Sequence, residues 1–337
     1  SHYVEGESRY IWMADSEGKP VLVDLEEPVD EALLSTKNGA NNQYWLYTRR
    51  LQFLVMNTFT TSYFFCHYFA TYFANYQLFV FRRNPSNAQA LFNGNINSVR
   101  NSNYAANRAL KVIVHGLNNN GHSPLNPLIT SAFLAVQDVN VIVVDWRGPA
   151  NSGYSTAFNA VPNVGQHLGN FLIWLINNAG GNWNNVHLVG HSLGAHVVGN
   201  AGLPMHKKMV KHLIITGLDP AGPRWHNNGN ALNRNSGRYV EAIHTDGNLA
   251  GIMSAVGHAD FYPNGGKNPQ PGCTTSFCSH GRANELFAAT VRYNRLIGRW
   301  CPNIWEAELS TCNGPSLHMG NANLSNSNQN QFFIGST

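Results

Sequence analysis

The sequence predicts an α/β fold, in which a mostly parallel, doubly wound sheet carries helices on both faces. Five short runs of mainly β-branched residues recur along the chain, at 111–114, 139–144, 186–189, 213–216 and 239–243. Such runs are typical of parallel strands that are buried on both faces. An apolar stripe with helical spacing, from Val161 to Ile176, lies between the second and third runs and ends at two glycines. Because strand and helix alternate, we expect a functional site at the carboxyl ends of the strands.

Composition excludes several other classes of protein. Of the 337 residues, 43% are hydrophobic and 12% are charged, and 22 basic against 18 acidic residues give a net charge of +4. This composition is typical of a chain that folds around a core. No fixed period runs along the sequence, which argues against a coiled coil or a repeat array. Basic residues form no cluster longer than a doublet, so we expect no nucleic-acid partner.

The first 40 residues differ in charge from the remainder. Nine of the 18 acidic residues lie in residues 1–40, together with three basic residues. We interpret 1–40 as an acidic N-terminal arm, either a pro-segment or a solvated tail, because runs of charge are usually solvated. Residues 41–337 are then the main α/β domain.

Residues 51–83 form an anomalous insert. This stretch of 33 residues holds 12 of the 38 aromatic residues, the odd cysteine Cys66 and no acidic residue. It can be read as a membrane span, although polar residues interrupt every apolar run of the required length, or as an amphipathic insert. Its removal would join Arg50 to Asn84-Pro85, an ordinary junction of strand and turn. We therefore interpret the insert as an artefact of the gene model.

A sharp-turn motif stands between the third predicted strand and a helix-compatible run, Gly190-His191-Ser192-Leu193-Gly194. A G-x-S-x-G motif in this context is the nucleophile elbow of the α/β-hydrolase fold, which holds its serine exposed on a tight turn. Gly190 and Gly194 are required because side chains there would clash across the turn. We therefore predict an α/β-hydrolase fold with Ser192 as its nucleophile.

A serine hydroxyl needs a base to take its proton and an acid to orient that base. In this fold the acid follows the serine in the chain and precedes the histidine. Asp219 comes at the end of the run 213–218 and is followed by Pro220, which places its carboxylate at the edge of the sheet. We predict Asp219 as the orienting acid. Asp246, at the end of the next strand, is the alternative.

The base must be one of the histidines that follow this acid, which are His226, His244, His258, His280 and His318. His244 lies within a strand pattern, which favours a structural role. His280 follows Cys278-Ser279 and precedes a helical stretch at 283–293, so that a local disulfide could clamp a loop that carries the base. We predict His280.

Attack on an ester creates a negative oxygen, which two backbone N–H groups must stabilise. One N–H belongs to the residue after the nucleophile, Leu193, and the other comes from a loop that follows an earlier strand. His115-Gly116 ends the run 111–114, which makes the N–H of Leu117 the natural second donor. This chemistry requires no metal and no redox cofactor, and we expect neither.

Four of the five cysteines form two short-range pairs, Cys273 with Cys278 and Cys301 with Cys312. Local pairs of this kind are typical of disulfides in an oxidising compartment. A zinc site at Cys273, Cys278 and His280 is the alternative, but no fourth ligand stands at the usual spacing. Asn323 begins a glycosylation sequon. We therefore expect an extracellular protein.

Several motifs together resemble the pancreatic-lipase-like family of secreted serine lipases and phospholipases A1, and its insect members most closely. The residues that carry the resemblance are Val114-His115-Gly116, Val144-Asp145-Trp146, Gly190–Gly194, Gly217–Pro223, Ile243–Asp246, Asp260–Gly266 and Cys278-Ser279-His280. The resemblance extends from about Asn42 to the C-terminus, apart from 51–83. It implies that Ser192, Asp219 and His280 form a catalytic triad.

Departures from the family pattern suggest a substrate. Cys273 and Cys278 enclose only four residues, where vertebrate pancreatic lipases carry a long lid, and the loop between His244 and Asp260 is short. In the family these features resemble phospholipases A1, so we expect hydrolysis of the sn-1 ester of phospholipids or galactolipids at a membrane or micelle interface. A triacylglycerol lipase is the alternative, and a catalytically silent storage protein of the yolk type is an alternative of another class. We expect neither a C-terminal lipid-binding β-sandwich nor a need for colipase.

Overall fold

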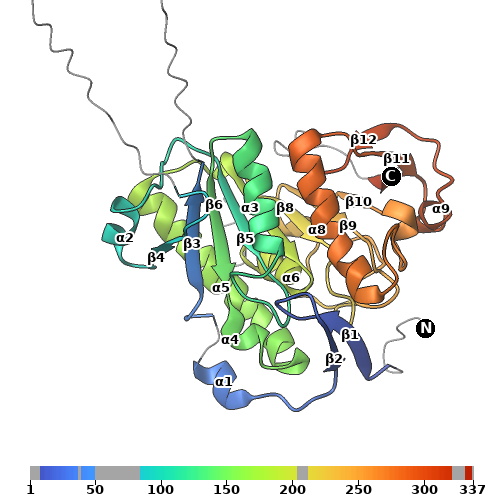
Figure 1. The fold of residues 1–337 in the computed structure, drawn as a ribbon, viewed down its shortest axis with the longest axis horizontal. Helices are drawn as coiled ribbons and strands as arrows, with labels where there is room; N and C mark the ends of the chain where they lie inside the picture. Colours follow the sequence, from blue (N-terminus) through green and yellow to red (C-terminus); the bar gives the residue numbers. More distant parts are fainter. Residues whose placement is uncertain (1–7, 37–38, 50–83, 203–211, 321–330, 336–337) are drawn as a thin grey trace, which may run out of the picture.

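The computed structural model describes residues 8–36, 39–49, 84–202, 212–320 and 331–335, and within these an 11-stranded sheet forms the centre (Figure 1). The strands, in the order in which they lie side by side, are β12 (Ser316–His318), β11 (Ile297–Cys301), β13 (Gln331–Gly335), β10 (Ala259–Phe261), β9 (Tyr239–Ile243), β8 (Ile214–Leu218), β7 (Val186–His191), β5 (Leu110–Val114), β6 (Asn140–Asp145), β3 (Gln43–Thr48) and β4 (Gln89–Leu91). All neighbours from β13 to β6 are parallel, whereas the outer strands pair antiparallel. The mostly parallel sheet predicted from the sequence is therefore confirmed, with the five predicted runs as β5 to β9.

Helices cover both faces of this sheet, as expected for a doubly wound fold. Along β5, Val112 and Val114 face one apolar core, whereas Ile113 faces the other. The first core is closed by α5 (Tyr154–Ala179) and α6 (Leu193–Asn200), and the second by α3 (Leu125–Val136) and α8 (Ser276–Tyr293). Because side chains alternate along a strand, a sheet covered on both faces needs continuous apolar runs. The shorter helices are α1 (Glu31–Thr36), α2 (Ile96–Arg100), α4 (Arg147–Ala150), α9 (Ile304–Glu308) and the 3₁₀ turns Trp183–Asn185, Arg234–Ser236 and Pro263–Gly266.

The helix after the disulfide loop begins earlier than the sequence predicts. We expected a helix at 283–293, preceded by a loop that carries His280. Helix α8 instead begins at Ser276, because the hydroxyl of Thr275 accepts a hydrogen bond from the N–H of Cys278 at 3.4 Å and caps the first turn. His280 therefore stands on a helix and not on a loop.

The N-terminal arm is partly built into the domain. Strands β1 (Tyr10–Ala14) and β2 (Pro20–Asp24) form an antiparallel hairpin that lies beside α8 (Figure 1). Ile11 and Met13 on its inner face are buried in the first core, together with Val23. A solvated tail, favoured by the density of acids, is therefore wrong for this stretch. Alternate side chains of the two strands turn inward, so Ile11, Met13 and Val23 are buried, whereas Tyr10, Trp12 and Leu22 on the other face are exposed.

The insert 51–83, with Cys66, lies outside the described residues, but the residues that flank it lie close together. The hydroxyl of Thr48, at the end of β3, donates to Asn84 Oδ1 at 2.8 Å, and the amide of Asn84 donates to the carbonyl of Leu46 at 2.6 Å. A direct join between β3 and β4 would therefore leave the strands in place. Among the helices of the described ranges, none is long and apolar enough to cross a membrane.

A chain of buried polar side chains crosses the sheet beneath α3 and α8. His187 donates from Nε2 to the hydroxyl of Thr216 at 2.9 Å, and that hydroxyl donates to Glu241 Oε1 at 3.3 Å. The hydroxyl of Tyr239 donates to the other oxygen of Glu241 at 3.2 Å. Glu241 is fully buried, and this burial raises its pKa to about 8. Burial thus favours the neutral form of Glu241, against the two hydrogen bonds that favour the ionised form.

We expect Glu241→Gln to weaken the pH dependence of stability. Between about pH 4.5 and about pH 8 the carboxyl of Glu241 is ionised in the unfolded chain but still protonated in the folded one. The free energy of unfolding therefore falls as pH rises through this window. Glutamine cannot ionise, and thus the variant should gain on the native protein by up to a few kcal/mol over this window. Urea unfolding between pH 5 and pH 9 measures the difference. The exposed Glu17→Gln serves as the control, and parallel curves for Glu241→Gln and the native protein would contradict a neutral Glu241.

Candidate active site

Ser192 stands on a strained turn between β7 and α6. Its φ of 56° lies in the left-handed region, where side chains are rare. The flanking glycines make this turn possible, because a Cβ on Gly190 would lie 2.1 Å from the carbonyl oxygen of Gly194. A Cβ on Gly194 would in turn lie 2.4 Å from the carbonyl oxygen of Val114. The backbones of the strand and the helix are thus in direct contact, and the serine lies at the carboxyl end of β7.

Asp219 follows β8, the strand adjacent to β7, and is fully buried. Its backbone is also left-handed, with a φ of 39°. One carboxylate oxygen, Oδ1, accepts hydrogen bonds from the N–H groups of Thr245 at 2.7 Å and Asp246 at 3.1 Å. These two amides satisfy one side of the carboxylate and leave Oδ2 free to meet another group.

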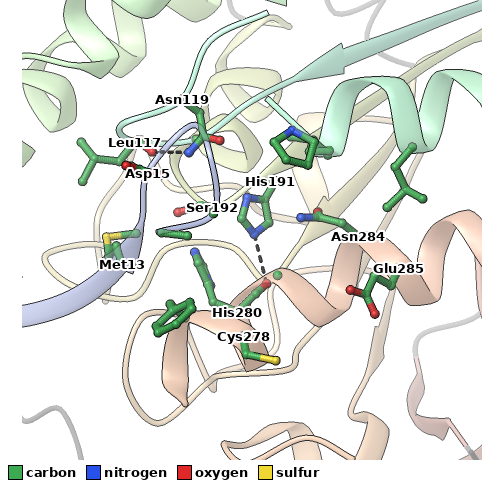
Figure 2. A pocket seen from close by; sticks show the side chains of 18 residues that line it. Met13, Asp15, Leu117, Asn119, His191, Ser192, Cys278, His280, Asn284 and Glu285 are labelled. Carbon is green, nitrogen blue, oxygen red and sulfur yellow. Dashed lines mark hydrogen bonds between the residues drawn. The ribbon is translucent and has the colours of Figure 1, made fainter. Parts of the chain in front are cut away.

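His280 provides that other group. Its Nδ1 donates to Asp219 Oδ2 at 2.6 Å, with both side chains buried. Its second nitrogen, Nε2, and the Oγ of Ser192 have no hydrogen-bond partner within the described part of the chain, and both side chains border one cavity (Figure 2). With the proton on Nδ1 held by the carboxylate, Nε2 presents a lone pair that can accept a proton. The structure thus brings together all three residues that the sequence predicts.

Asp246, the alternative acid, lies beside this pair without contacting the imidazole. Ligating atoms of Asp219, Asp246 and His280 lie within 4.8 Å of one another. The Oδ2 of Asp246 accepts hydrogen bonds from the N–H of Ala250 at 3.1 Å and from the hydroxyl of Ser276. Burial, and after it the charge of Asp219, raises the pKa of Asp246 to about 7. Asp219, and not Asp246, therefore orients His280 in this structure.

Two backbone N–H groups lie next to the serine. In the described ranges, the N–H groups of Leu117 and Leu193 donate to no protein acceptor. The loop of Leu117 approaches the elbow closely, since a Cβ on Gly116 would lie 2.8 Å from the Cβ of Ser192. Free donors beside a nucleophile form a pocket in which an anionic oxygen is stabilised.

Trp146 fastens this loop, a role that the sequence analysis missed. Its N–H donates to His115 Nε2 at 3.2 Å, and its indole N–H donates to the carbonyl of His115 at 2.7 Å. The Nδ1 of His115 then carries the proton and donates to the carbonyl of Gly116 at 3.0 Å. The pairing of β5 with β6 brings the two motifs together. The sequence analysis singled out His115 for the loop that follows it, but only the resemblance to known lipases pointed to Trp146.

Neighbouring histidines are occupied elsewhere. His191 donates from Nε2 to the carbonyl of His280 at 3.1 Å, and desolvation, followed by the nearby His280, lowers its pKa to about 3. A neutral His191 therefore supports the backbone that carries the base. His244 donates from Nδ1 to the carbonyl of Ile252 at 2.7 Å and contacts Asp260 through Nε2 at 2.9 Å. This agrees with the structural role expected from its strand position.

The cavity has a volume of about 320 Å³ and opens at the carboxyl ends of the strands (Figure 2). Its wall includes residues of the N-terminal hairpin, which nothing in the sequence placed near the serine. The lining residues are Met13, Ala14, Asp15, Gly18, Gly116, Leu117, Asn119, Pro124, Leu125, Leu128, His191, Ser192, Phe277, Cys278, His280, Gly281, Asn284 and Glu285. A mostly apolar cavity of this kind suits a substrate with an acyl chain.

Disulfides join Cys273 to Cys278 and Cys301 to Cys312, as predicted. Cys278 of the first pair lies in the first turn of α8, two residues before His280. A zinc site at these cysteines is wrong, because the two sulfur atoms are bonded to each other. The sequon at Asn323 lies outside the described residues.

The fold and the site define the class of the protein. It has an α/β-hydrolase fold, with serine and aspartate at the ends of two neighbouring strands and a histidine from helix α8 between them and the cavity. The sequence profile of the Lipase family matches residues 68–297. The chain belongs to this family.

Two known proteins that are similar to this chain are named for different lipid substrates. The chain is 37% identical to the pancreatic triacylglycerol lipase of Mus musculus over 204 residues, and this match covers 58% of this chain and 43% of that protein. It is 37% identical to Phospholipase A1 2 of Polistes dominula over 215 residues, and this match covers 60% of this chain and 66% of that protein. The chain thus spans about half the length of the pancreatic lipases that it matches, and 66% of the phospholipase. Its likeness to the solved structure of Est1E from Butyrivibrio proteoclasticus, with a TM-score of 0.27 and 13% identity over 35% of this chain and 43% of that chain, is too low to carry an argument.

Proposed function

We propose that this chain is an extracellular serine hydrolase that cleaves carboxylic esters of glycerolipids, with a preference for the sn-1 ester of phospholipids. The observation that carries the proposal is the 2.6 Å hydrogen bond between His280 and Asp219, with Nε2 of that histidine unpaired at the cavity that Ser192 borders. Family membership supports ester hydrolysis, and the two disulfides support an oxidising compartment.

In the first half of the reaction Ser192 Oγ attacks the ester carbonyl while His280 Nε2 accepts the hydroxyl proton. Asp219 stabilises the imidazolium that forms. The N–H groups of Leu117 and Leu193 hold the negative oxygen of the tetrahedral intermediate. His280 then donates its proton to the departing alcohol oxygen, the C–O bond breaks, and an acyl-serine and a lysolipid remain.

Water completes the cycle through the same groups. His280 accepts a proton from water as its oxygen attacks the acyl carbon, and then returns that proton to Ser192 Oγ as the acyl bond breaks. The products are a fatty acid and the free enzyme. His280 thus acts first as base and then as acid in each half.

The preference for phospholipids rests on the short loop between Cys273 and Cys278. This loop leaves only Phe277 and Cys278 at the cavity wall, and similarity to a phospholipase A1 supports the same choice. Similarity to pancreatic triacylglycerol lipases favours the second candidate, triacylglycerol hydrolysis.

Fatty-acid release from phosphatidylcholine and from triolein, on chains with and without 51–83, separates these candidates. We expect release from phosphatidylcholine to be at least about tenfold faster, a difference of about 1.4 kcal/mol in the barrier. Equal rates, or faster release from triolein, would exclude the phospholipid preference. Failure of a fluorophosphonate to label Ser192 in folded protein would favour a catalytically silent lipid-binding protein.

A further inference from the structure

The outer face of the N-terminal hairpin exposes large apolar side chains to solvent. Tyr10, Trp12 and Leu22 are 52%, 54% and 50% exposed. Trp12 lies directly opposite Leu22 in the register of the hairpin, so the two side chains share a face, and Tyr10 joins them two residues away. We call this group of three side chains the hairpin face. Such a cluster costs solubility unless a partner covers it.

The hairpin face runs into the wall of the catalytic cavity. Ala14, two residues beyond Trp12, belongs to the same side of β1 and lines that cavity, together with Met13, Asp15 and Gly18. The inner side of the hairpin is anchored, because Ile11 and Met13 are buried in the first core. The exposed side is therefore held beside the opening through which substrate must pass.

Two ion pairs stand at the two ends of the hairpin. Arg9 bonds to Asp24 at 2.7 Å at one end of the hairpin, and Lys19 bonds to Glu17 at 2.6 Å at the other. The carboxylate of Asp15 accepts the N–H groups of Glu17 and Lys19. Three acids, Asp15, Glu17 and Asp24, against two bases leave the hairpin with a net charge of −1, so its apolar centre suits a partner that carries no net negative charge. A zwitterionic lipid surface has this property, and indole rings favour the headgroup level of such a surface.

We propose that the hairpin face is the surface by which this protein sits on a phospholipid bilayer, with the cavity mouth turned to the lipid. This inference rests on the proposed function, because continuity with the cavity matters only if the substrate is a lipid. Insertion of Trp12 and Leu22 removes their apolar area from water and places the opening beside the ester groups.

Binding is tested on Ser192→Ala protein by co-sedimentation with phosphatidylcholine vesicles. We expect Trp12→Ser with Leu22→Ser to lower the partition coefficient by about tenfold or more, since two large apolar side chains are lost. A matched control is Trp305→Ser with Leu309→Ser, because these residues are 67% and 52% exposed on and beside α9 and do not line the cavity. Helix α9 also lies apart from β1 and β2 (Figure 1). The control pair should bind as the parent does, and thermal unfolding checks that both variants fold.

Brominated phosphatidylcholine provides a second readout that needs no polar substitution. Trp12→Phe should still bind vesicles, but the brominated lipid should quench much less of its remaining tryptophan fluorescence. Trp305→Phe should bind vesicles and be quenched as the parent is. Equal effects of the two double variants, or undiminished binding without Trp12 and Leu22, would overturn the proposal. So would a dimer that the Trp12/Leu22 variant separates while vesicle binding persists, because a second copy would then cover the hairpin face.

Failure of the proposed function gives a different pattern. The Ser192→Ala protein need not turn over lipid for its binding to be measured. If the native protein binds vesicles through Trp12 and Leu22 but releases no fatty acid, the hairpin face remains a lipid-binding surface and only the enzymatic proposal falls.

Discussion

Ser192→Ala should lower the rate of ester hydrolysis by about 10⁶-fold, the largest single effect that we expect. In the proposed mechanism Ser192 Oγ is the atom that forms the acyl intermediate, and neither His280 nor the free N–H groups can replace it. Stability should change little, because Ser192 Oγ makes no hydrogen bond in the described part of the chain. Steady-state hydrolysis of phosphatidylcholine, with thermal unfolding in parallel, measures both quantities.

The control for this variant is a surface serine, Ser131→Ala, whose hydroxyl bonds to the carbonyl of Leu128 on α3. It should retain full activity. A loss below about tenfold in Ser192→Ala would show that another group attacks the ester, and the assignment of the elbow as the catalytic centre would then be wrong.

Asp219→Asn should lower kcat/KM by about 10⁴-fold while the site keeps its shape. The side-chain oxygen of asparagine can still accept the amides of Thr245 and Asp246, so the backbone is held. Its NH₂ group, however, would face His280 Nδ1 as a donor and favour the tautomer with the proton on Nε2. That tautomer cannot take the proton of Ser192. Activity across pH 5 to pH 9 measures the loss.

Asp246→Asn is the matched control for this change. Because the pKa of Asp246 is about 7, asparagine resembles its protonated form, and at pH 6 the variant should stay within about tenfold of the native rate. An equal loss in Asp246→Asn and Asp219→Asn would show that Asp246 takes part in orienting the base. An active Asp219→Asn would show that Asp246 can replace its neighbour.

The features that sequence predicted well are those that depend on local backbone geometry. The G-x-S-x-G turn needs glycine where strand and helix touch, so Gly190 and Gly194 mark it in any such chain. Asp219 could be predicted for the same reason, because Pro220 ends a buried strand and leaves the preceding carboxylate at the edge of the sheet. Both assignments follow from a few adjacent residues and the order of strands.

The features that sequence did not predict depend on contacts between distant segments. Spacing alone does not decide which of several histidines is the base. The residues that cap and begin α8 at Ser276 are expected from the sequence to form a loop. The hold of Trp146 on His115 arises only when β5 and β6 pair. The burial of Ile11 and Met13 was not predicted, because the N-terminal arm was judged by its number of acids. A count of charges does not show which side chains of a strand share a face.

The hairpin wall has a consequence for biosynthesis. Met13 and His280 border one cavity although they stand near opposite ends of the chain. During translation the hairpin is made before the helix that it packs beside. A nascent chain therefore lacks His280, and a partner for the hairpin on α8, until that helix has also left the ribosome.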